Sequence, residues 1–342
     1  KVAMLSTFAL DFFTTLAIAI LAVFLGLRLI NGHILLFPAL AILILAPEYF
    51  LPIRNFASDY HATLNGKNSF HAVRRILEMP LPKRPTVELH QWTGVDELSL
   101  ENVEFMYPQN GSELTNLDLT VKGNQKIGII GMSGAGKTTL INLLSGFLAP
   151  TSGQITIQGK KVTTLDIHDW QKQILYIPQT PYIFADTLKN NIAFYTPNVS
   201  EDKIKEAIHV VGLDNLVAEL PQGLETMIGS GHRALSGGQA QRIALARAFL
   251  DPERRVMIFD EPTAHLDIET ELELKKRMLP LMENRLVFFA THRLHWMKQM
   301  DYILVLKNGK LIEQGTYQQL LDEHGYFTEL MDQTRGKEIT HE

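Results

Sequence analysis

Residues 126–139 read KIGIIGMSGAGKTT, and this stretch decides the fold. Its apolar start, residues 126–130, predicts a short buried β-strand, and residues 140–145 after it predict a helix. The spacing G-x-x-x-x-G-K-T between them is typical of a phosphate-binding P-loop in its strand–loop–helix setting. Backbone N–H groups of such a loop, together with the helix N-terminus, bind phosphate oxygens. The sequence therefore predicts an α/β fold of the P-loop NTPase class.

This loop supplies the predicted nucleotide-binding residues. The side chain of Lys137 is expected to bind the β- and γ-phosphate oxygens, and the hydroxyl of Thr138 is expected to bind Mg²⁺. ATP and Mg²⁺ are therefore the predicted cofactors. The full predicted loop comprises Gly131, Met132, Ser133, Gly134, Ala135, Gly136, Lys137, Thr138 and Thr139.

Two further apolar strands end in residues that suit catalysis. Residues 256–259 lead to Asp260 and Glu261. We expect Asp260 to hold Mg²⁺ through water and Glu261 to polarise the attacking water. Residues 286–290 lead to His292, and a strand's carboxyl end lies on the ligand side of a parallel sheet. Adjacent acids can be solvated turn residues and a lone histidine is often structural, but the P-loop upstream favours catalytic roles.

A second helix start with open backbone N–H groups lies at residues 235–239, LSGGQ. Ser236 is a suitable N-cap for a predicted helix over residues 240–250, and Gly237 and Gly238 leave N–H groups accessible. One nucleotide does not need two such helix starts on one molecule. We therefore expect Ser236, Gly237, Gly238 and Gln239 to bind the nucleotide held by a second domain in a dimer.

The order of these motifs over residues 96–334 resembles that of ABC ATPases, which carry the LSGGQ element. The resemblance implies that Tyr107 stacks on adenine and that Gln179 contacts Mg²⁺ and senses the membrane domain. It also implies that residues 263–267, which end at Asp267, cross the dimer interface. The sequence departs from exporters near Ser230, where they usually carry an acidic residue in a loop that contacts the membrane domain.

The first part of the chain has a different composition from the rest. Residues 4–27 and 34–53 are apolar runs, which predict two transmembrane helices, since a span needs about 20 such residues. Basic residues after the second run favour a cytosolic location for both ends of this pair. A buried helical hairpin in a soluble protein is the alternative. Because the chain begins with Lys1 and enters an apolar run at once, we expect it to be part of a longer protein.

These observations predict two domains of the 342-residue chain. Residues 1–79 form the end of a membrane domain with a cytosolic helical extension, and residues 80–94, rich in proline, form a linker. Residues 95–334 form the nucleotide-binding domain, and residues 335–342 form a tail. The absence of cysteine excludes disulfides and thiol chemistry within this chain, and the net charge of −5 argues against nucleic-acid binding.

Asp11 and Glu48 are carboxylates within or near the apolar runs. Such groups are costly in lipid and often line a substrate path. The alternative is that both lie near the cytosolic boundary, where helices extend beyond the bilayer. Both interpretations stay open.

Residues 45–54, 60–62 and 260–267 resemble CydD-type subunits of ABC exporters. The resemblance implies a heterodimer with a CydC-type half-transporter in the plasma membrane, multi-pass and in contact with lipid, with the nucleotide-binding domain in the cytoplasm. It also implies export of thiols such as cysteine or glutathione for cytochrome bd assembly. The alternatives are a homodimeric multidrug or lipid exporter, a soluble ABC ATPase and a peptide exporter with a protease domain.

Overall fold

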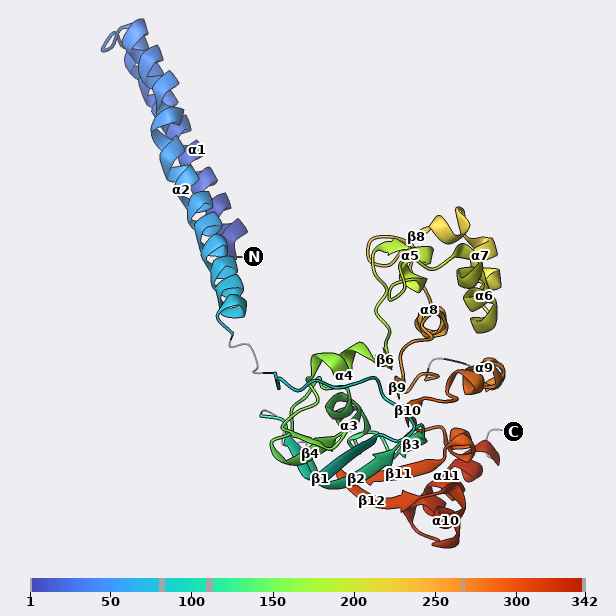
Figure 1. Ribbon diagram of the computed structural model, residues 1–342. Helices are drawn as coiled ribbons and strands as arrows, with labels where there is room; N and C mark the ends of the chain where they lie inside the picture. Colours follow the sequence, from blue (N-terminus) through green and yellow to red (C-terminus); the bar gives the residue numbers. More distant parts are fainter. Residues whose placement is uncertain (1, 80–83, 109–112, 265, 267, 340–342) are drawn as a thin grey trace. The chain divides into compact units, whose positions relative to one another are not determined.

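The computed structural model describes residues 2–79, 84–108, 113–264, 266 and 268–339 (Figure 1). Contacts between Cα atoms divide the chain into unit 1, Lys1–Lys83, and unit 2, Arg84–Glu342. This division falls inside the predicted linker over residues 80–94.

Unit 1 is a hairpin of two helices, α1 (Val2–Ile30) and α2 (Leu36–Leu77). Within the described residues, Phe8–Ile30 is long and apolar enough to cross a membrane by length and composition alone. The apolar start of α2, Leu36–Pro52, is shorter than such a span, so two membrane helices remain a prediction. The polar sequence after this start continues the same helix to Leu77, as predicted.

The surface of α1 is unusually apolar for a helix facing water. Phe13 and Val23 are each 65% exposed in unit 1, and many other large apolar side chains of α1 are also exposed. A surface of this kind needs lipid or protein around it. The composition of α1 therefore agrees with the predicted membrane location.

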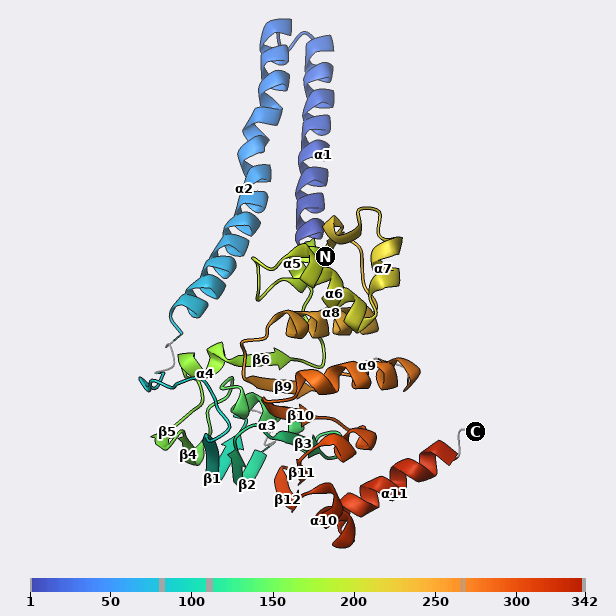
Figure 2. The same ribbon diagram turned by 45° about the vertical axis from the view of Figure 1, so that its right-hand side comes forward.

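Unit 2 is built on a six-stranded sheet with the order β12-β11-β3-β10-β9-β6, which can be followed strand by strand in Figure 2. Neighbouring strands are parallel except at the β11–β12 edge. Its strands are β3 (Lys126–Ile130), β6 (Ile174–Ile177), β9 (Val256–Asp260), β10 (Leu286–Ala290), β11 (Tyr302–Lys307) and β12 (Lys310–Gly315). The predicted strands 126–130 and 286–290 have the bounds of β3 and β10.

A second, antiparallel sheet has the order β2-β1-β4-β5. Its strands are β1 (Glu97–Met106), β2 (Glu113–Lys122), β4 (Ser152–Ile157) and β5 (Lys160–Val162). Apolar side chains from both sheets pack around α3 (Lys137–Leu144) in one core cluster. The helix that follows the P-loop is therefore held from two sides.

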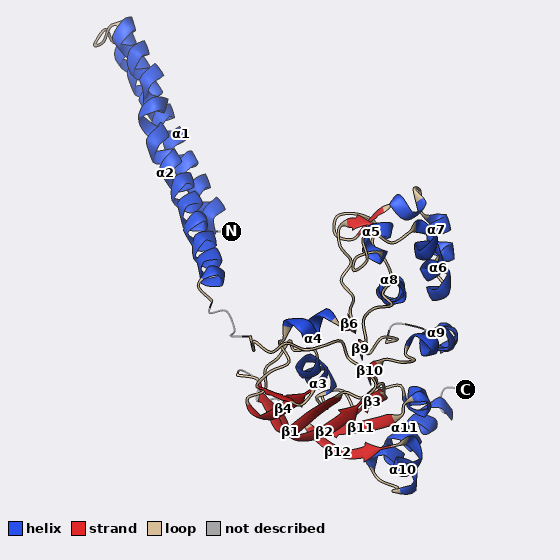
Figure 3. Cartoon of the chain, viewed as in Figure 1, coloured by secondary structure: helices blue, strands red, loops and turns tan. Residues whose placement is uncertain are grey.

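Helices gather on the other side of the six-stranded sheet, as Figure 3 shows in blue. A second core cluster joins them to that sheet. These elements are α5 (Leu188–Ile192), α6 (Glu201–Val211), α7 (Asp214–Glu219), η1 (Gly223–Glu225), α8 (Gly237–Leu250) and α9 (Ile268–Leu281), with the short pair β7 (Asp186–Thr187) and β8 (Met227–Ile228). The remaining elements are α4 (His168–Lys172), η2 (Leu294–Gln299), α10 (Tyr317–Asp322) and α11 (Tyr326–Ile339).

Both ends of unit 2 differ from the predicted boundaries. Trp92, in the predicted linker, is 2% exposed, and its Nε1 donates to the carbonyl of Gly123 at 2.9 Å. Its ring also meets that of Trp170, with centroids 5.7 Å apart. At the other end, α11 continues to Ile339, past residue 334 and into the predicted tail. Such packing depends on contacts between residues that are distant in the sequence, so local composition does not predict it.

Candidate nucleotide site

A cavity of about 670 Å³ opens beside the P-loop at the carboxyl ends of β3, β9 and β10. These strands are adjacent and parallel, so the segments that follow them meet at one sheet edge, where ligands bind in folds of this type. Ala290 pairs with Asp260 and with Ile129, which brings the three strand ends into register. The cavity is lined by Ile130, Gly131, Met132, Ser133, Gly134, Gly136, Lys137, Thr138, Thr139, Gln179, Glu261, His292, Leu294, Leu330 and Gln333.

The P-loop is close-packed against its surroundings. A Cβ atom at Gly131 would lie 2.4 Å from the carbonyl oxygen of Leu306, so a side chain does not fit there. Lys137 is 7% exposed, and its Nζ donates to the carbonyl oxygens of Gly131 at 2.9 Å and Met132 at 3.3 Å. The ammonium group is therefore held at the centre of the loop, where it suits binding of phosphate oxygens.

Glu261 lies between Lys137 and His292, the two other ionisable side chains that line the cavity. One of its oxygens is hydrogen-bonded to Nδ1 of His292, and the other lies 3.5 Å from Nζ of Lys137. Its N–H donates to the carbonyl of Ala290 at 2.9 Å, and its φ of 50° lies in the left-handed region. The backbone is thus fixed in a conformation that side chains with a Cβ rarely adopt.

The electrostatics keep Glu261 ionised. Burial raises the pKa of its carboxyl, but the hydrogen bond and charge of His292 and the charge of Lys137 outweigh burial, so the net pKa lies below its ordinary value. A carboxylate in this state can accept a proton from water. The side chain of Glu261 is 10% exposed and that of His292 is 57% exposed. His292 is therefore the more accessible member of the pair.

Asp260 does not line the cavity itself, but it is hydrogen-bonded to Thr138, which does. Thr138 Oγ1 donates to Oδ1 of Asp260 at 3.3 Å, so the two predicted metal-binding side chains are brought together. The pKa of Asp260 is raised, first by burial and then by the charge of Glu261, while Thr138 and Lys137 oppose the rise. Burial and the charge of Asp260 also raise the pKa of Tyr176 to about 12.

The side chains of Thr138 and Asp260 suit a magnesium ion whose coordination shell would be completed by phosphate oxygens. Mg²⁺ takes one or two carboxylate or hydroxyl ligands together with phosphate oxygens and water. In the part of the chain that the structure describes, no group of three or more His, Cys, Asp or Glu side chains is arranged to hold a metal ion by itself. Thr138, Asp260 and Gln179 remain the predicted metal-binding residues.

Residues 114–264 match the family model described as ABC transporter. Unit 2 carries an ABC transporter nucleotide-binding domain. The chain as a whole resembles exporter-type proteins in which this domain is fused to a membrane domain, as three relatives show.

One relative is "Glutathione/L-cysteine transport system ATP-binding/permease protein CydC" of Bacillus subtilis, 54% identical over 98% of this chain and 59% of its own length. Another is the corresponding protein CydD of Escherichia coli, 33% identical over 97% of this chain and 58% of its own. A solved structure, titled as a bacterial Atm1-family ABC exporter with ATP bound, aligns with a TM-score of 0.69 at 26% identity, covering 96% of this chain and 58% of that one. The chain thus spans less than two thirds of each relative.

The LSGGQ element of the ABC domain lies apart from the cavity. Ser236 caps α8 as predicted: its Oγ accepts from the N–H of Gln239 at 3.2 Å, and Gln239 Oε1 accepts from the N–H of Ser236 at 2.9 Å. None of the residues Ser236, Gly237, Gly238 and Gln239 lines the cavity of this chain. Their binding to a nucleotide in a second domain stays a prediction.

Tyr107 and Ala135 are two other predicted nucleotide contacts, and neither lines the cavity of the ABC domain. Tyr107 is half-buried and packs edge-on against Phe105, with ring centroids 4.7 Å apart, and it does not line the cavity. Asp267 lies outside the described residues. The roles of Tyr107 and Asp267 remain predictions from the resemblance.

Sequence analysis missed four residues that line the cavity of the ABC domain, namely Ile130 at the end of β3 and three residues from later segments. Leu294 belongs to η2, and Leu330 and Gln333 belong to α11 near the chain's end. The spacing of three between Leu330 and Gln333 places both on one face of α11. No motif marks this face, so only its position in the fold reveals it.

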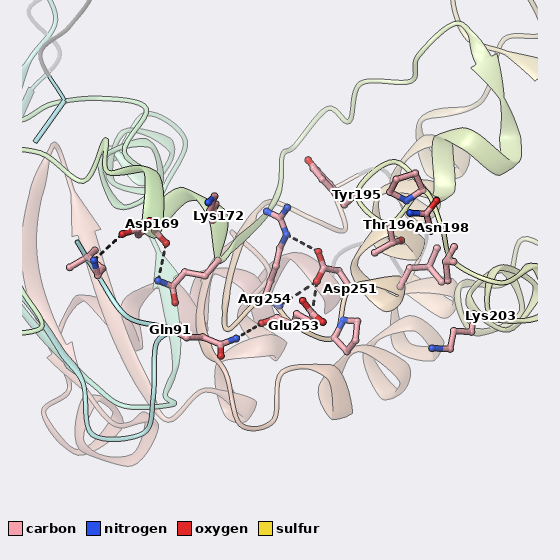
Figure 4. A pocket seen from close by; sticks show the side chains of 16 residues that line it. Gln91, Asp169, Lys172, Tyr195, Thr196, Asn198, Lys203, Asp251, Glu253 and Arg254 are labelled. Atoms are coloured by element: carbon pink, nitrogen blue, oxygen red, sulfur yellow. Dashed lines mark hydrogen bonds and ion pairs between the residues drawn. The ribbon is translucent and has the colours of Figure 1, made fainter. Parts of the chain in front are cut away.

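The ABC domain has a second cavity of about 700 Å³, which contains none of the predicted site residues (Figure 4). Asp251 and Arg254 form an ion pair at 2.7 Å within it, and Gln91 donates to the carbonyl of Glu253 at 2.9 Å. The guanidinium of Arg254 also lies 4.8 Å from the ring centroid of Tyr195. The charged groups of this second cavity are thus partly neutralised by one another.

Proposed function

We propose that the chain is the ATP-hydrolysing half of an ABC exporter that transports thiols such as glutathione or cysteine. The observation that carries the enzymatic part is the single cavity shared by the P-loop, Glu261 and His292. The names of the relatives carry the choice of cargo.

Hydrolysis at this site follows from the positions of three side chains. Lys137 and the loop N–H groups bind the phosphates and stabilise the charge that develops during phosphoryl transfer. Glu261 accepts a proton from the water that attacks the γ-phosphorus, while the bond between phosphorus and the leaving oxygen of ADP breaks. His292 keeps the carboxylate oriented through its hydrogen bond. Magnesium bound near Thr138 and Asp260 would neutralise phosphate charge.

The complete site needs a second half-transporter. In the proposed dimer, the start of α8 in each half, from Ser236 to Gly238, binds the nucleotide held by the P-loop of the other. Its exposed backbone N–H groups at a helix start suit a phosphate. ATP binding then closes the two domains and hydrolysis reopens them. We propose that Gln179, which lines the cavity, transmits this change to the membrane helices.

The sequence similarity of the CydC and CydD relatives to unit 1 supports a thiol as cargo. The CydC and CydD relatives match 97–98% of this chain, which includes nearly all of unit 1. A lipid A-core flippase from Ralstonia nicotianae is 37% identical over 68% of this chain, and one from Neisseria meningitidis is 32% identical over 88% of it. Because cargo is bound by the membrane domain, similarity that extends through unit 1 says more about cargo than similarity within the ABC domain.

The comparisons support a less specific subunit type than the sequence motifs suggested. Those motifs resemble CydD, but the Bacillus subtilis relative with 54% identity is named CydC, and CydD of Escherichia coli is 33% identical. We therefore propose a subunit of the CydC/CydD type, paired with a different half-transporter, without assigning it to one of the two names.

A plasma-membrane location with the ABC domain in the cytoplasm follows from the same proposal. α1 supplies an apolar span, and both named relatives are described as permeases. The proposed second span over residues 34–53 would complete a hairpin in lipid. The exposed apolar surface of α1 argues against a soluble ABC ATPase.

Transport into inverted membrane vesicles tests the proposed function. Vesicles from cells that produce the full-length protein and its partner should take up radiolabelled cysteine or glutathione with ATP but not with ADP. Vesicles with Glu261→Gln in this chain should show strongly reduced uptake. ATP hydrolysis without uptake of either thiol would reject the cargo, and stimulation of that hydrolysis by lipid in a homodimer would favour a lipid exporter.

A further inference from the structure

Glu271 is a buried carboxylate that none of the predicted motifs includes. It lies in the first turn of α9 and is 1% exposed. Its Oε1 accepts hydrogen bonds from Thr263 Oγ1 at 2.6 Å and from Trp296 Nε1 at 2.7 Å. Its Oε2 pairs with the guanidinium of Arg293, and Nε2 of His295 lies 3.4 Å from Oε1. A buried charge with this many partners is an organised site, because an unpaired one would be very costly.

The partners keep Glu271 ionised. Burial raises the pKa of its carboxyl. Hydrogen bonds from His295, Thr263 and Trp296 and the charge of Arg293 lower the pKa by more than burial raises it, so the net pKa is about 2. The helix N-terminus nearby also favours a negative charge. The carboxylate is therefore a permanent anchor for both segments around it at physiological pH.

These segments are the two that carry the proposed catalytic residues. Thr263 follows Glu261 by two residues and is 1% exposed. Arg293 directly follows His292 and also donates from its second terminal nitrogen to the carbonyl of Leu266 at 2.9 Å. Glu271 and Arg293 thus join the segment after β9 to the segment after β10.

We propose that Glu271 is a positioning residue that sets the contact between Glu261 and His292. This inference rests on the proposed ATP hydrolysis. Glu271 does not line the nucleotide cavity, so it acts through the two segments that it holds. A shift of either segment would move the carboxylate or the imidazole away from the γ-phosphate, and misplacement by about 1 Å can cost ~10²-fold in rate.

A purely structural role predicts a different result from a positioning role. Loss of a structural ion pair lowers the amount of folded protein or its melting temperature, and the folded molecules keep their turnover number. Loss of a positioning contact lowers kcat in folded protein and leaves KM for ATP unchanged, because the P-loop contacts are intact. The value of kcat per folded molecule, measured together with the KM for ATP, separates these roles.

The test compares Glu271→Gln with Glu273→Gln in the full-length protein, purified in the assembly that it forms. Glutamine keeps the size and one acceptor but loses the charge that pairs with Arg293. Glu273 is a matched control in the same helix, since its side chain is 65% exposed and pairs with Arg277 one turn away. We expect Glu271→Gln to lower kcat by about ten-fold or more with KM for ATP within about two-fold, and Glu273→Gln to change neither.

Arg293→Lys provides a second variant in case Glu271→Gln does not fold. Lysine keeps the charge but cannot contact both Glu271 and the carbonyl of Leu266 as a fork. We expect the same fall in kcat at constant KM. A folded Glu271→Gln protein with wild-type kcat would overturn the inference, as would wild-type kcat for Arg293→Lys if the glutamine variant is unfolded. A wild-type protein without ATPase activity would instead contradict the proposed function.

Discussion

The ammonium group of Lys137 lies 3.5 Å from the carboxylate of Glu261. The residue proposed to bind phosphate and the residue proposed to accept the proton are therefore direct neighbours across the cavity. Phosphate oxygens would share the lysine with Glu261, and the charge around the carboxylate would change when a nucleotide binds. This coupling leads to different expectations for the two residues.

Replacement of Lys137 by alanine should abolish ATP binding at ordinary concentrations. The substitution removes a buried cation proposed to bind the phosphates, and loss of one partner of a buried charge pair costs about 2–5 kcal/mol of binding free energy. Equilibrium binding of a fluorescent ATP analogue to the purified protein measures it. Lys122→Ala is the control, because that side chain is 70% exposed on the antiparallel sheet. Unchanged affinity in the Lys137 variant would contradict the assignment of the P-loop lysine.

Replacement of Glu261 by glutamine should preserve ATP binding and reduce hydrolysis by ~10²–10⁴-fold, the usual contribution of a general base. The amide keeps the size of the side chain but cannot accept the proton from water. ATP should then remain bound and hold two domains together, which size-exclusion chromatography with ATP detects. Turnover equal to wild type, in an assembly whose second site has been inactivated, would exclude Glu261 as the base.

The two glycines Gly131 and Gly134 should respond differently to alanine. A Cβ at Gly131 would collide with the backbone of Leu306, whereas at Gly134 nothing lies within 4 Å and the penalty comes from its φ of +79°. Gly134→Ala should therefore cost about 1–2 kcal/mol in the free energy of unfolding. Gly131→Ala should cost more and should weaken ATP binding. Thermal unfolding and nucleotide titration of both variants measure the difference, and equal effects would contradict the packing of the loop.

Glu271 should make the stability of unit 2 depend on pH under acidic conditions. Its pKa of about 2 in the folded chain lies below the ordinary value of 4.5, so its stabilising effect is complete above pH 4.5. The effect is lost as pH falls from 4.5 toward 2, by about 1.4 kcal/mol per unit. The difference in urea unfolding between wild type and Glu271→Gln should therefore shrink over this range. A constant difference would show that Glu271 is not ionised by its partners.

Asp11 and Glu48 can be tested with the transport assay. If they line the cargo path, Asp11→Asn and Glu48→Gln should slow thiol uptake while ATP binding is unchanged, because both lie in unit 1. Uptake at the wild-type rate in both variants would support the alternative, in which the two carboxylates lie at the cytosolic boundary.

The sequence predicted those parts of the fold that depend on neighbouring residues. β3 and β10 have the predicted bounds because each is a continuous apolar run that is buried on both faces. Ser236 was predicted as a cap because its own side chain bonds to a backbone group three residues away. The residues that gather around the P-loop were predicted because parallel strands bring their carboxyl ends together.

Other features depend on contacts that no local pattern shows. Glu271 stands in a run of alternating acidic and apolar residues and has the sequence of an ordinary exposed helix position. Its burial results from Trp296 and Arg293, which come from a later segment of the chain. Leu330 and Gln333 of α11 line the same cavity as Leu294 of η2, a position that their local sequence does not reveal. For the same reason, local sequence does not predict the packing of Trp92 within unit 2.

The left-handed backbone at Glu261 has a consequence for evolution of the site. In this conformation a residue with a Cβ lowers the free energy of unfolding by about 1–2 kcal/mol, a loss that glycine would avoid. Selection for a more stable chain alone would therefore favour glycine at position 261, whereas selection for turnover retains the acid. If Glu261 is the proposed base, directed evolution for thermal resistance without an activity screen should replace this residue early, whereas a screen for ATP hydrolysis should retain it.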